Sequence, residues 1–116
     1  MVISFVGHGN DGNVLFGTQS IPVVDIIQKI ADLNCPYIVA VAFFNCESLK
    51  NLNVTPKQFD ILGFRSEIPY DDMILFSTVV MNSFRHMFDF NEAVNDAITI
   101  IPSIGSKTCL INKFSA

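Results

Sequence analysis

The sequence predicts a single α/β domain with a mostly parallel sheet, and three observations lead to that prediction. The chain has 116 residues, which is the size of one ordinary domain. Hydrophobic residues make up 50% of it and charged residues only 16%, a composition that excludes an intrinsically disordered chain. Segments typical of strands and of helices alternate along the sequence, and that alternation is characteristic of a layered α/β domain.

Four short apolar segments are predicted to be strands of one sheet. The segment YIVAVAFF is apolar on both faces, as expected for a central parallel strand covered by helices on both sides. Residues 9–12 have turn chemistry, and the segment after them adds either a small hairpin or a loop. The predicted strands are Val2–Val6, Tyr37–Phe44, Phe59–Phe64 and Thr108–Asn112, with Asn13–Phe16 as the segment of the possible hairpin.

Apolar residues at helical spacing predict three helices between these strands. Ser20 is the expected N-cap of the first helix, with Pro22 in its first turn and its end near Asn34. Asp71 and Asp72 mark the start of a long second helix, where the helix dipole favours carboxylates. Asn91 is the expected cap of the third helix. Residues 49–58 are expected to be a loop, and residues 102–106 a helix break. The apolar faces of the three helices are, in order, Val23, Ile26, Ile27 and Ile30; Met73, Phe76, Val80, Phe84 and Met87; and Ala93, Val94, Ala97, Ile98 and Ile101.

Charge, hydropathy and cysteine content narrow the functional classes. The formal net charge is −4 and the sequence pI is about 4.8, so the chain lacks the basic surface that nucleic-acid binding requires. The longest apolar run is too short to span a bilayer, and no signal peptide is recognisable, so a cytoplasmic location is expected. Three cysteines do not suggest a disulfide framework. The mean hydropathy of +0.43 indicates a dry core or a surface for a partner.

A histidine and a cysteine follow the two strands that are predicted to be neighbours. Ligands of parallel sheets bind at the carboxyl ends of the strands, where His8 and Cys46 are expected. Neighbouring strands lie about 4.8 Å apart, so the two side chains can approach each other. The thiolate form of a cysteine is a nucleophile, and an imidazole can accept the proton of the thiol and later donate it. The backbone amides of Gly9 and Cys46 are candidates for an oxyanion hole.

The order of these motifs resembles the caspase-like cysteine peptidases, and most closely their CHAT branch. A strand ending in His-Gly is followed by a helix and by an apolar strand ending in Cys-x-Ser. The segments Leu62–Asp72 and Phe90–Ala93 also resemble the strand, turn and helix start of CHAT domains. The resemblance implies a three-layer α/β/α sandwich whose last strand is antiparallel. It also implies a cysteine endopeptidase acting on a protein or peptide substrate without a cofactor, with His8 as general base and Cys46 as nucleophile.

Two features depart from the family pattern. Asn45 stands where many CHAT domains have a small residue. Only Met1 precedes the first strand, whereas the family has two further strands there, so residues 1–116 are expected to be one domain that corresponds to its catalytic second part. The sheet edge at Val2–Val6 would then be open, which predicts a homodimer or a partner chain that completes the sheet.

Side chains beside the dyad are candidates for a substrate rim, namely Asn45, Glu47, Ser48 and Arg65. Arg65 belongs to a charged cluster with Glu67, Asp71 and Asp72, which is alternatively a solvated turn before a helix. Cys35 and Cys109 are expected to be structural.

Three other functions remain as alternatives. Residues 7–12 fit G-x-G-x-x-G, but a dinucleotide site needs a helix to open at the last glycine. A metal site lacks its usual ligand spacing, since His8 and His86 are the only histidines. The strongest alternative is an inactive or incomplete caspase-like interaction module, because a fold alone does not establish activity.

Overall fold

The centre of the molecule is a four-stranded sheet, seen in a computed structural model that describes residues 1–52 and 58–113. Its strand order is β1 (Val2–Val6), β5 (Ala40–Phe44), β6 (Asp60–Phe64) and β7 (Thr108–Ile111). The first three strands are parallel, and β7 is antiparallel to β6. The predicted mostly parallel sheet with an antiparallel last strand is therefore confirmed.

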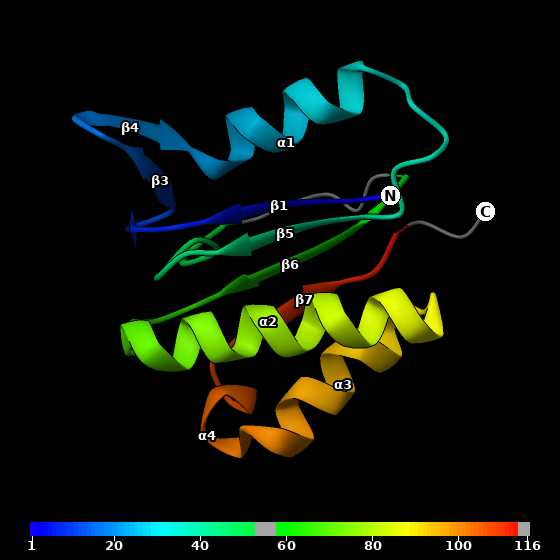
Figure 1. Cartoon of the computed structure of the whole chain (residues 1–116). Coiled ribbons are helices and arrows are strands. Elements are labelled where there is room, and N and C mark those ends of the chain that lie inside the picture. The colour runs from blue at the N-terminus through cyan, green and yellow to red at the C-terminus, as the bar shows by residue number, and fades with distance from the viewer. Residues whose placement is uncertain (53–57, 114–116) are drawn as a thin grey trace.

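Helices cover both faces of this sheet (Figure 1). On one face lies α1 (Val23–Asp32), and on the other lie α2 (Tyr70–Met87), α3 (Phe90–Ile100) and the short α4 (Pro102–Gly105). All five residues of β5 are buried. Their side chains alternate between the two cores, because successive strand residues point to opposite faces: Val41 and Phe43 belong to the α1 side, and Ala40, Ala42 and Phe44 to the α2 side.

A small second sheet leads from β1 to α1. It contains β2 (Gly9–Asn10), β3 (Asn13–Phe16) and β4 (Gln19–Pro22) in antiparallel order. Asp11 and Gly12 join β2 to β3 with φ values of 54° and 84°. Two positive φ values in a two-residue connection are the requirement of a type I′ hairpin turn, for which Asp-Gly is well suited. Of the two possibilities for this segment, the hairpin is the one observed.

The starts of two helices differ from the prediction. Ser20 is not a helix cap but a residue of β4, where it pairs with Leu15. Because strand pairing occupies the backbone through Pro22, α1 begins only at Val23, whose N–H donates to the Gly12 carbonyl. The cap of α3 is Asp89 rather than Asn91, and its carboxylate accepts a hydrogen bond of 3.2 Å from the Glu92 N–H.

The central strand is shorter than its apolar run. It begins at Ala40, and Tyr37 is 75% exposed in the turn that follows Pro36. The third strand likewise begins one residue later than predicted, at Asp60. Leu49 and Leu52 lie in the predicted loop, of which residues 53–57 are outside the described part of the chain. Among the described residues, no helix has both the length and the apolar character needed to cross a membrane.

Candidate active site

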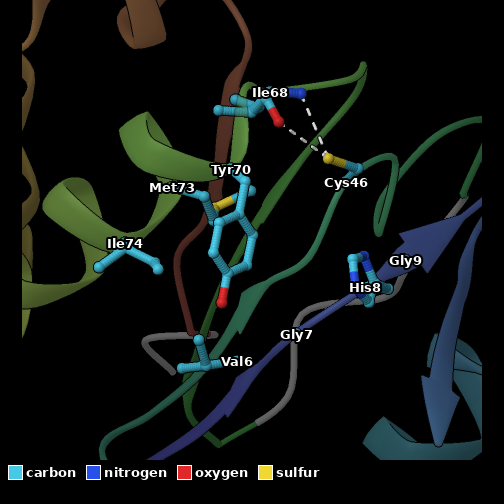
Figure 2. Close-up of a pocket in the computed structure, with 9 residues that line it drawn as sticks. All are labelled: Val6, Gly7, His8, Gly9, Cys46, Ile68, Tyr70, Met73 and Ile74. Atoms are coloured by element: carbon cyan, nitrogen blue, oxygen red, sulfur yellow. Dashed lines mark hydrogen bonds between the residues drawn. The ribbon is translucent and has the colours of Figure 1, made fainter. Parts of the chain in front are cut away.

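His8 and Cys46 occupy equivalent positions on two neighbouring strands. The last paired residues of β1 and β5 are Val6 and Phe44, and each candidate residue follows its strand by two positions. Both residues line one pocket of about 120 Å³ at the carboxyl end of the sheet (Figure 2). The two strand ends therefore bring both residues to the lining of the same pocket.

The thiol of Cys46 is held by the backbone of Ile68. The Ile68 N–H donates to Sγ at 3.3 Å, and the thiol donates to the Ile68 carbonyl at 3.2 Å. The His8 imidazole lies nearly parallel to the ring of Tyr70, with 6.2 Å between ring centroids. Within residues 1–52 and 58–113, no hydrogen bond joins His8 to Cys46. The two side chains therefore line the same pocket but are not hydrogen-bonded to each other (Figure 2).

The backbone amide of Cys46 is left free by the side chain of Asn45. The Gly7 N–H donates to the Phe44 carbonyl at 3.4 Å, so the next donor of a continued parallel ladder would be the Cys46 N–H, bonded to the Gly7 carbonyl. Asn45 Nδ2 instead donates to that carbonyl at 3.1 Å. In the described part of the chain the Cys46 N–H consequently has no hydrogen-bond partner.

The backbone of Gly9 lies against that same peptide. A Cβ at position 9 would stand 2.5 Å from the Cys46 carbonyl oxygen and 2.7 Å from Asn45 Cβ, so only glycine fits. The Leu15 N–H donates to the His8 carbonyl, which makes Gly9 and Val14 a non-hydrogen-bonded pair of the hairpin. The Gly9 amide therefore points away from β3. The amides of Gly9 and Cys46, both proposed for an oxyanion hole, therefore lie where the segment after β1 contacts the loop after β5.

Two of the four predicted rim residues are wrong as rim residues. Asn45 and Ser48 are fully buried. Ser48 Oγ accepts from the Phe64 N–H at 3.1 Å and donates to the Phe43 carbonyl, so it fastens the turn after β5 to β6. The turn places these polar side chains beneath the loops, and strand ends need such partners because buried backbone groups must be paired.

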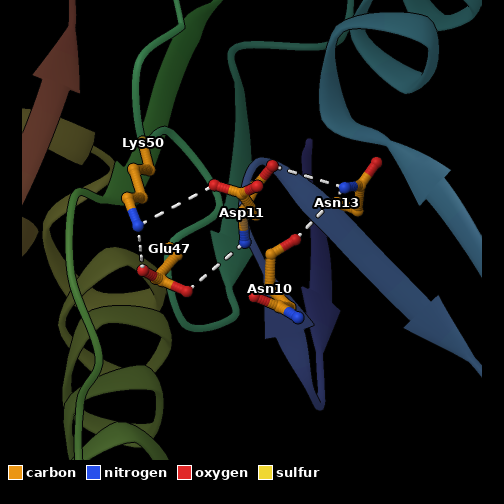
Figure 3. Close-up of polar contacts among 5 residues, drawn as sticks. All are labelled: Asn10, Asp11, Asn13, Glu47 and Lys50. Atoms are coloured by element: carbon orange, nitrogen blue, oxygen red, sulfur yellow. Dashed lines mark hydrogen bonds and ion pairs between the residues drawn. The ribbon is translucent and has the colours of Figure 1, made fainter.

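Glu47 and Arg65 reach the surface, but neither lines the pocket. Glu47 accepts a 2.8 Å hydrogen bond from the Lys50 ammonium and a longer one from the Asp11 N–H, and Asp11 also faces Lys50 (Figure 3). The hydrogen bond from Lys50 lowers the pKa of the Glu47 carboxyl. Through these contacts Glu47 connects the hairpin turn at Asp11 to the loop after β5.

Arg65 lies elsewhere: its Nη2 donates toward the Cys109 sulfur at 3.6 Å.

The pocket also contains residues that the sequence did not single out as a site. They come from the end of β1, from the turn before α2 and from its first turns, and they are Val6, Ile68, Tyr70, Met73 and Ile74. The sequence pointed to this region only in general terms, through the resemblance of Leu62–Asp72 to the turn and helix start of CHAT domains and through the charged cluster at Arg65.

The alternative sites find less support. Gly12 leads into β3 rather than into a helix, so residues 7–12 lack the strand-turn-helix context of a dinucleotide fingerprint. No group of three potential metal ligands occurs among the described residues. Cys35, Cys46 and Cys109 are free thiols.

Comparisons with known proteins do not assign the chain to a family: no family model matches it, and no curated protein matches it significantly.

Proposed function

We propose that this chain is a cysteine endopeptidase-type domain of the caspase-like superfamily, in its CHAT branch, with Cys46 as nucleophile and His8 as general base. One observation carries the proposal: His8 and Cys46 stand at equivalent positions beyond two paired parallel strands, and together with Gly9 they line a single pocket. That edge of a parallel sheet is where ligands are bound. The antiparallel last strand and the helices on both faces agree with the fold that the resemblance implies.

The reaction uses the two side chains in turn. His8 accepts the thiol proton, and the thiolate of Cys46 adds to the carbonyl carbon of the scissile peptide. The carbon–nitrogen bond then breaks as the imidazolium gives its proton to the leaving amine. Water, deprotonated by His8, adds to the resulting thioester. The carbon–sulfur bond breaks, and the thiolate and the imidazolium are returned to their starting forms by proton transfer.

The free amides of Gly9 and Cys46 supply the donors that such a reaction needs. Negative charge develops on the carbonyl oxygen in both addition steps, and backbone N–H groups aimed at it stabilise the transition state. Asn45 is a positioning residue in this scheme, because its side chain takes the Gly7 carbonyl and releases the Cys46 N–H. The thiol must also leave the Ile68 carbonyl, since that oxygen would repel a thiolate.

The test compares three cysteine variants in a peptide-library cleavage assay. Cys46→Ala is expected to abolish cleavage and His8→Ala to reduce it by orders of magnitude, while both proteins stay folded by circular dichroism. Cys35→Ala and Cys109→Ala are matched controls that should retain cleavage. In the wild type, iodoacetamide should modify Cys46 before the other two thiols. Cleavage that survives Cys46→Ala overturns the proposal.

A second candidate function, an inactive interaction module, is favoured by the open edge of the sheet. β1 is an outer strand of the four-stranded sheet, it contains no charge and no proline, and Val6 at its end is exposed. Natural proteins protect such edges because unpaired strand groups recruit another chain. A second copy could pair with β1 as a symmetric dimer.

Sedimentation at micromolar concentration tests this candidate, with Ser4→Pro in the centre of β1 as the variant that blocks pairing. A dimer that Ser4→Pro dissociates, together with a Cys46 thiol no faster than Cys35, favours the module. A monomer argues against it.

The odd number of free thiols accords with the cytoplasmic location expected from the sequence.

A further inference from the structure

The pocket beside Cys46 has an apolar lining. Beside His8, Cys46 and the two glycines, the lining consists of four aliphatic or thioether side chains and one aromatic ring: Val6, Ile68, Met73, Ile74 and Tyr70. Among the described residues that line it, none is an aspartate, glutamate, lysine or arginine. An ionic group that entered the apolar part of the pocket, between Val6, Met73 and Ile74, would lose its hydration without gaining a hydrogen-bond partner from those side chains.

Several of these apolar side chains are exposed although they converge on one place. Val6 is 61% exposed, Tyr70 60% and Ile74 40%. They come from β1 and α2, which lie far apart in the sequence, and Figure 2 shows them around one hollow. Exposed apolar side chains that gather in a concave site are typical of ligand-binding surfaces, because covering them releases water.

The volume of the pocket limits the size of the occupant. It measures about 120 Å³, whereas an engineered apolar cavity of about 150 Å³ holds a benzene molecule. A branched aliphatic group such as the side chain of leucine or valine is therefore of suitable size. The two-ring side chain of tryptophan is too large.

We propose that this pocket binds a branched aliphatic side chain of the substrate, on the residue whose carbonyl carbon Cys46 attacks. This inference rests on the proposed function, since it takes Cys46 as the nucleophile. The pocket adjoins the thiol, so the side chain of the attacked residue is the one that reaches it. Acidic and basic side chains are disfavoured at that position because the walls that would surround them, Val6, Ile68, Met73 and Ile74, are apolar. The two lining groups that the proposed reaction charges, His8 and Cys46, act on the scissile peptide itself.

The experiment uses four peptidyl chloromethyl ketones that differ only in the last residue, which is leucine, aspartate, arginine or tryptophan. Intact-mass spectrometry of the full chain gives the rate of Cys46 alkylation, and the iodoacetamide rate normalises it for thiol reactivity. The leucine probe is expected to react at least about 10-fold faster than the others, the lower bound of what an apolar pocket discriminates. Equal rates, or a faster reaction of a charged probe, overturn the inference.

Two variants of α2 connect the preference to the pocket. Ile74→Asp should slow the leucine probe and speed the arginine probe, whereas Leu75→Asp is the matched control, since Leu75 is similarly exposed but does not line the pocket. Tyr70→Ala, at another exposed position, should enlarge the pocket and raise the relative rate of the tryptophan probe. Unchanged ratios in both pocket variants contradict the proposed contact.

Failure of this inference can be told apart from failure of the proposed function. A reactive Cys46 that treats all four peptides alike removes the side-chain pocket and leaves the nucleophile. A Cys46 that reacts slowly with iodoacetamide but still prefers the leucine probe removes the peptidase and supports an apolar binding site.

Discussion

The middle of the central strand and its carboxyl end are equally buried but are held in different ways. Val41 and Phe43 are surrounded by apolar side chains, so their packing depends on how well side-chain volumes fill the space and not on the directions of hydrogen bonds. One residue beyond β5 the buried groups become polar, with Asn45 and Ser48 hydrogen-bonded to specific backbone atoms. Burial at the strand end thus fixes the position of loops, whereas burial in the middle supplies stability.

The largest effect should come from the apolar region. Phe76 is fully buried and contacts the rings of Phe44 and Phe64. Phe76→Ala is expected to lower the free energy of unfolding by about 3–5 kcal/mol, the usual cost of deleting a buried aromatic ring. Urea denaturation measures it. The exposed Tyr37→Ala is the control and should change stability little; a loss below about 1 kcal/mol for Phe76→Ala would contradict the packing described.

Gly9→Ala tests the contact between the two loops. The added methyl group would meet the Cys46 carbonyl and Asn45 Cβ, so the loops must separate. We expect a loss of about 1–3 kcal/mol, as for overpacked sites, and a changed rate of Cys46 alkylation. Gly17→Ala is the control: its φ of +62° is unfavourable for alanine, but nothing lies within 4 Å. Gly17→Ala should lower stability without altering the alkylation rate.

Asn45→Ala and Ser48→Ala separate a positioning role from a structural one. Ser48→Ala leaves the buried Phe64 N–H without its partner, which costs about 1–3 kcal/mol. Asn45→Ala should cost less, because the Cys46 N–H can take over the Gly7 carbonyl and the buried Asn45 Oδ1 has no described partner to lose. Only Asn45→Ala should also reduce peptide cleavage relative to iodoacetamide alkylation, because alkylation develops no oxyanion. The Cys46 N–H is then free to pair with the Gly7 carbonyl. An equal change of that ratio in both variants would refute the role of Asn45.

The smallest effect concerns the partly buried ion pair between Glu47 and Lys50. Since Lys50 lowers the pKa of Glu47 in the folded protein, the stabilisation is complete above the unfolded carboxyl range, near pH 4.3, and disappears as the pH falls through the lowered value. Glu47→Gln should therefore be less stable than the wild type at pH 6, and the difference should vanish at lower pH. Thermal unfolding between pH 2.5 and 6 measures it, and salt should weaken it. A difference that grows on acidification would show the opposite sign.

The sequence was most informative about the sheet and about the residues directly after its strands. The bounds of Val2–Val6 and the positions of His8 and Cys46 followed from short apolar runs that end at Gly7 and at Asn45. Helix starts were predicted less well: Ser20 has the chemistry of a helix cap, but in the structure it pairs with Leu15 in the hairpin of β3 and β4.

The walls of the pocket could not have been found in this way. Ile68 and Tyr70 reach Cys46 only after the chain has formed β6 and returned to the carboxyl edge of the sheet. Nothing in their local sequence distinguishes them from other apolar residues at a turn. Likewise, Asn45 and Ser48 look like surface residues in the sequence, and only the turn geometry buries them.

The position of β1 at the edge of the sheet has a consequence for amide hydrogen exchange. Because the Gly7 N–H bonds to β5, alternation along a parallel strand directs the amides of Ile3 and Phe5 to β5 as well. The amides of Val2, Ser4 and Val6 then face outward. In a monomer placed in deuterated solvent, amide exchange along β1 should therefore alternate between fast and slow from one residue to the next. A second chain paired along β1 would make all of them slow.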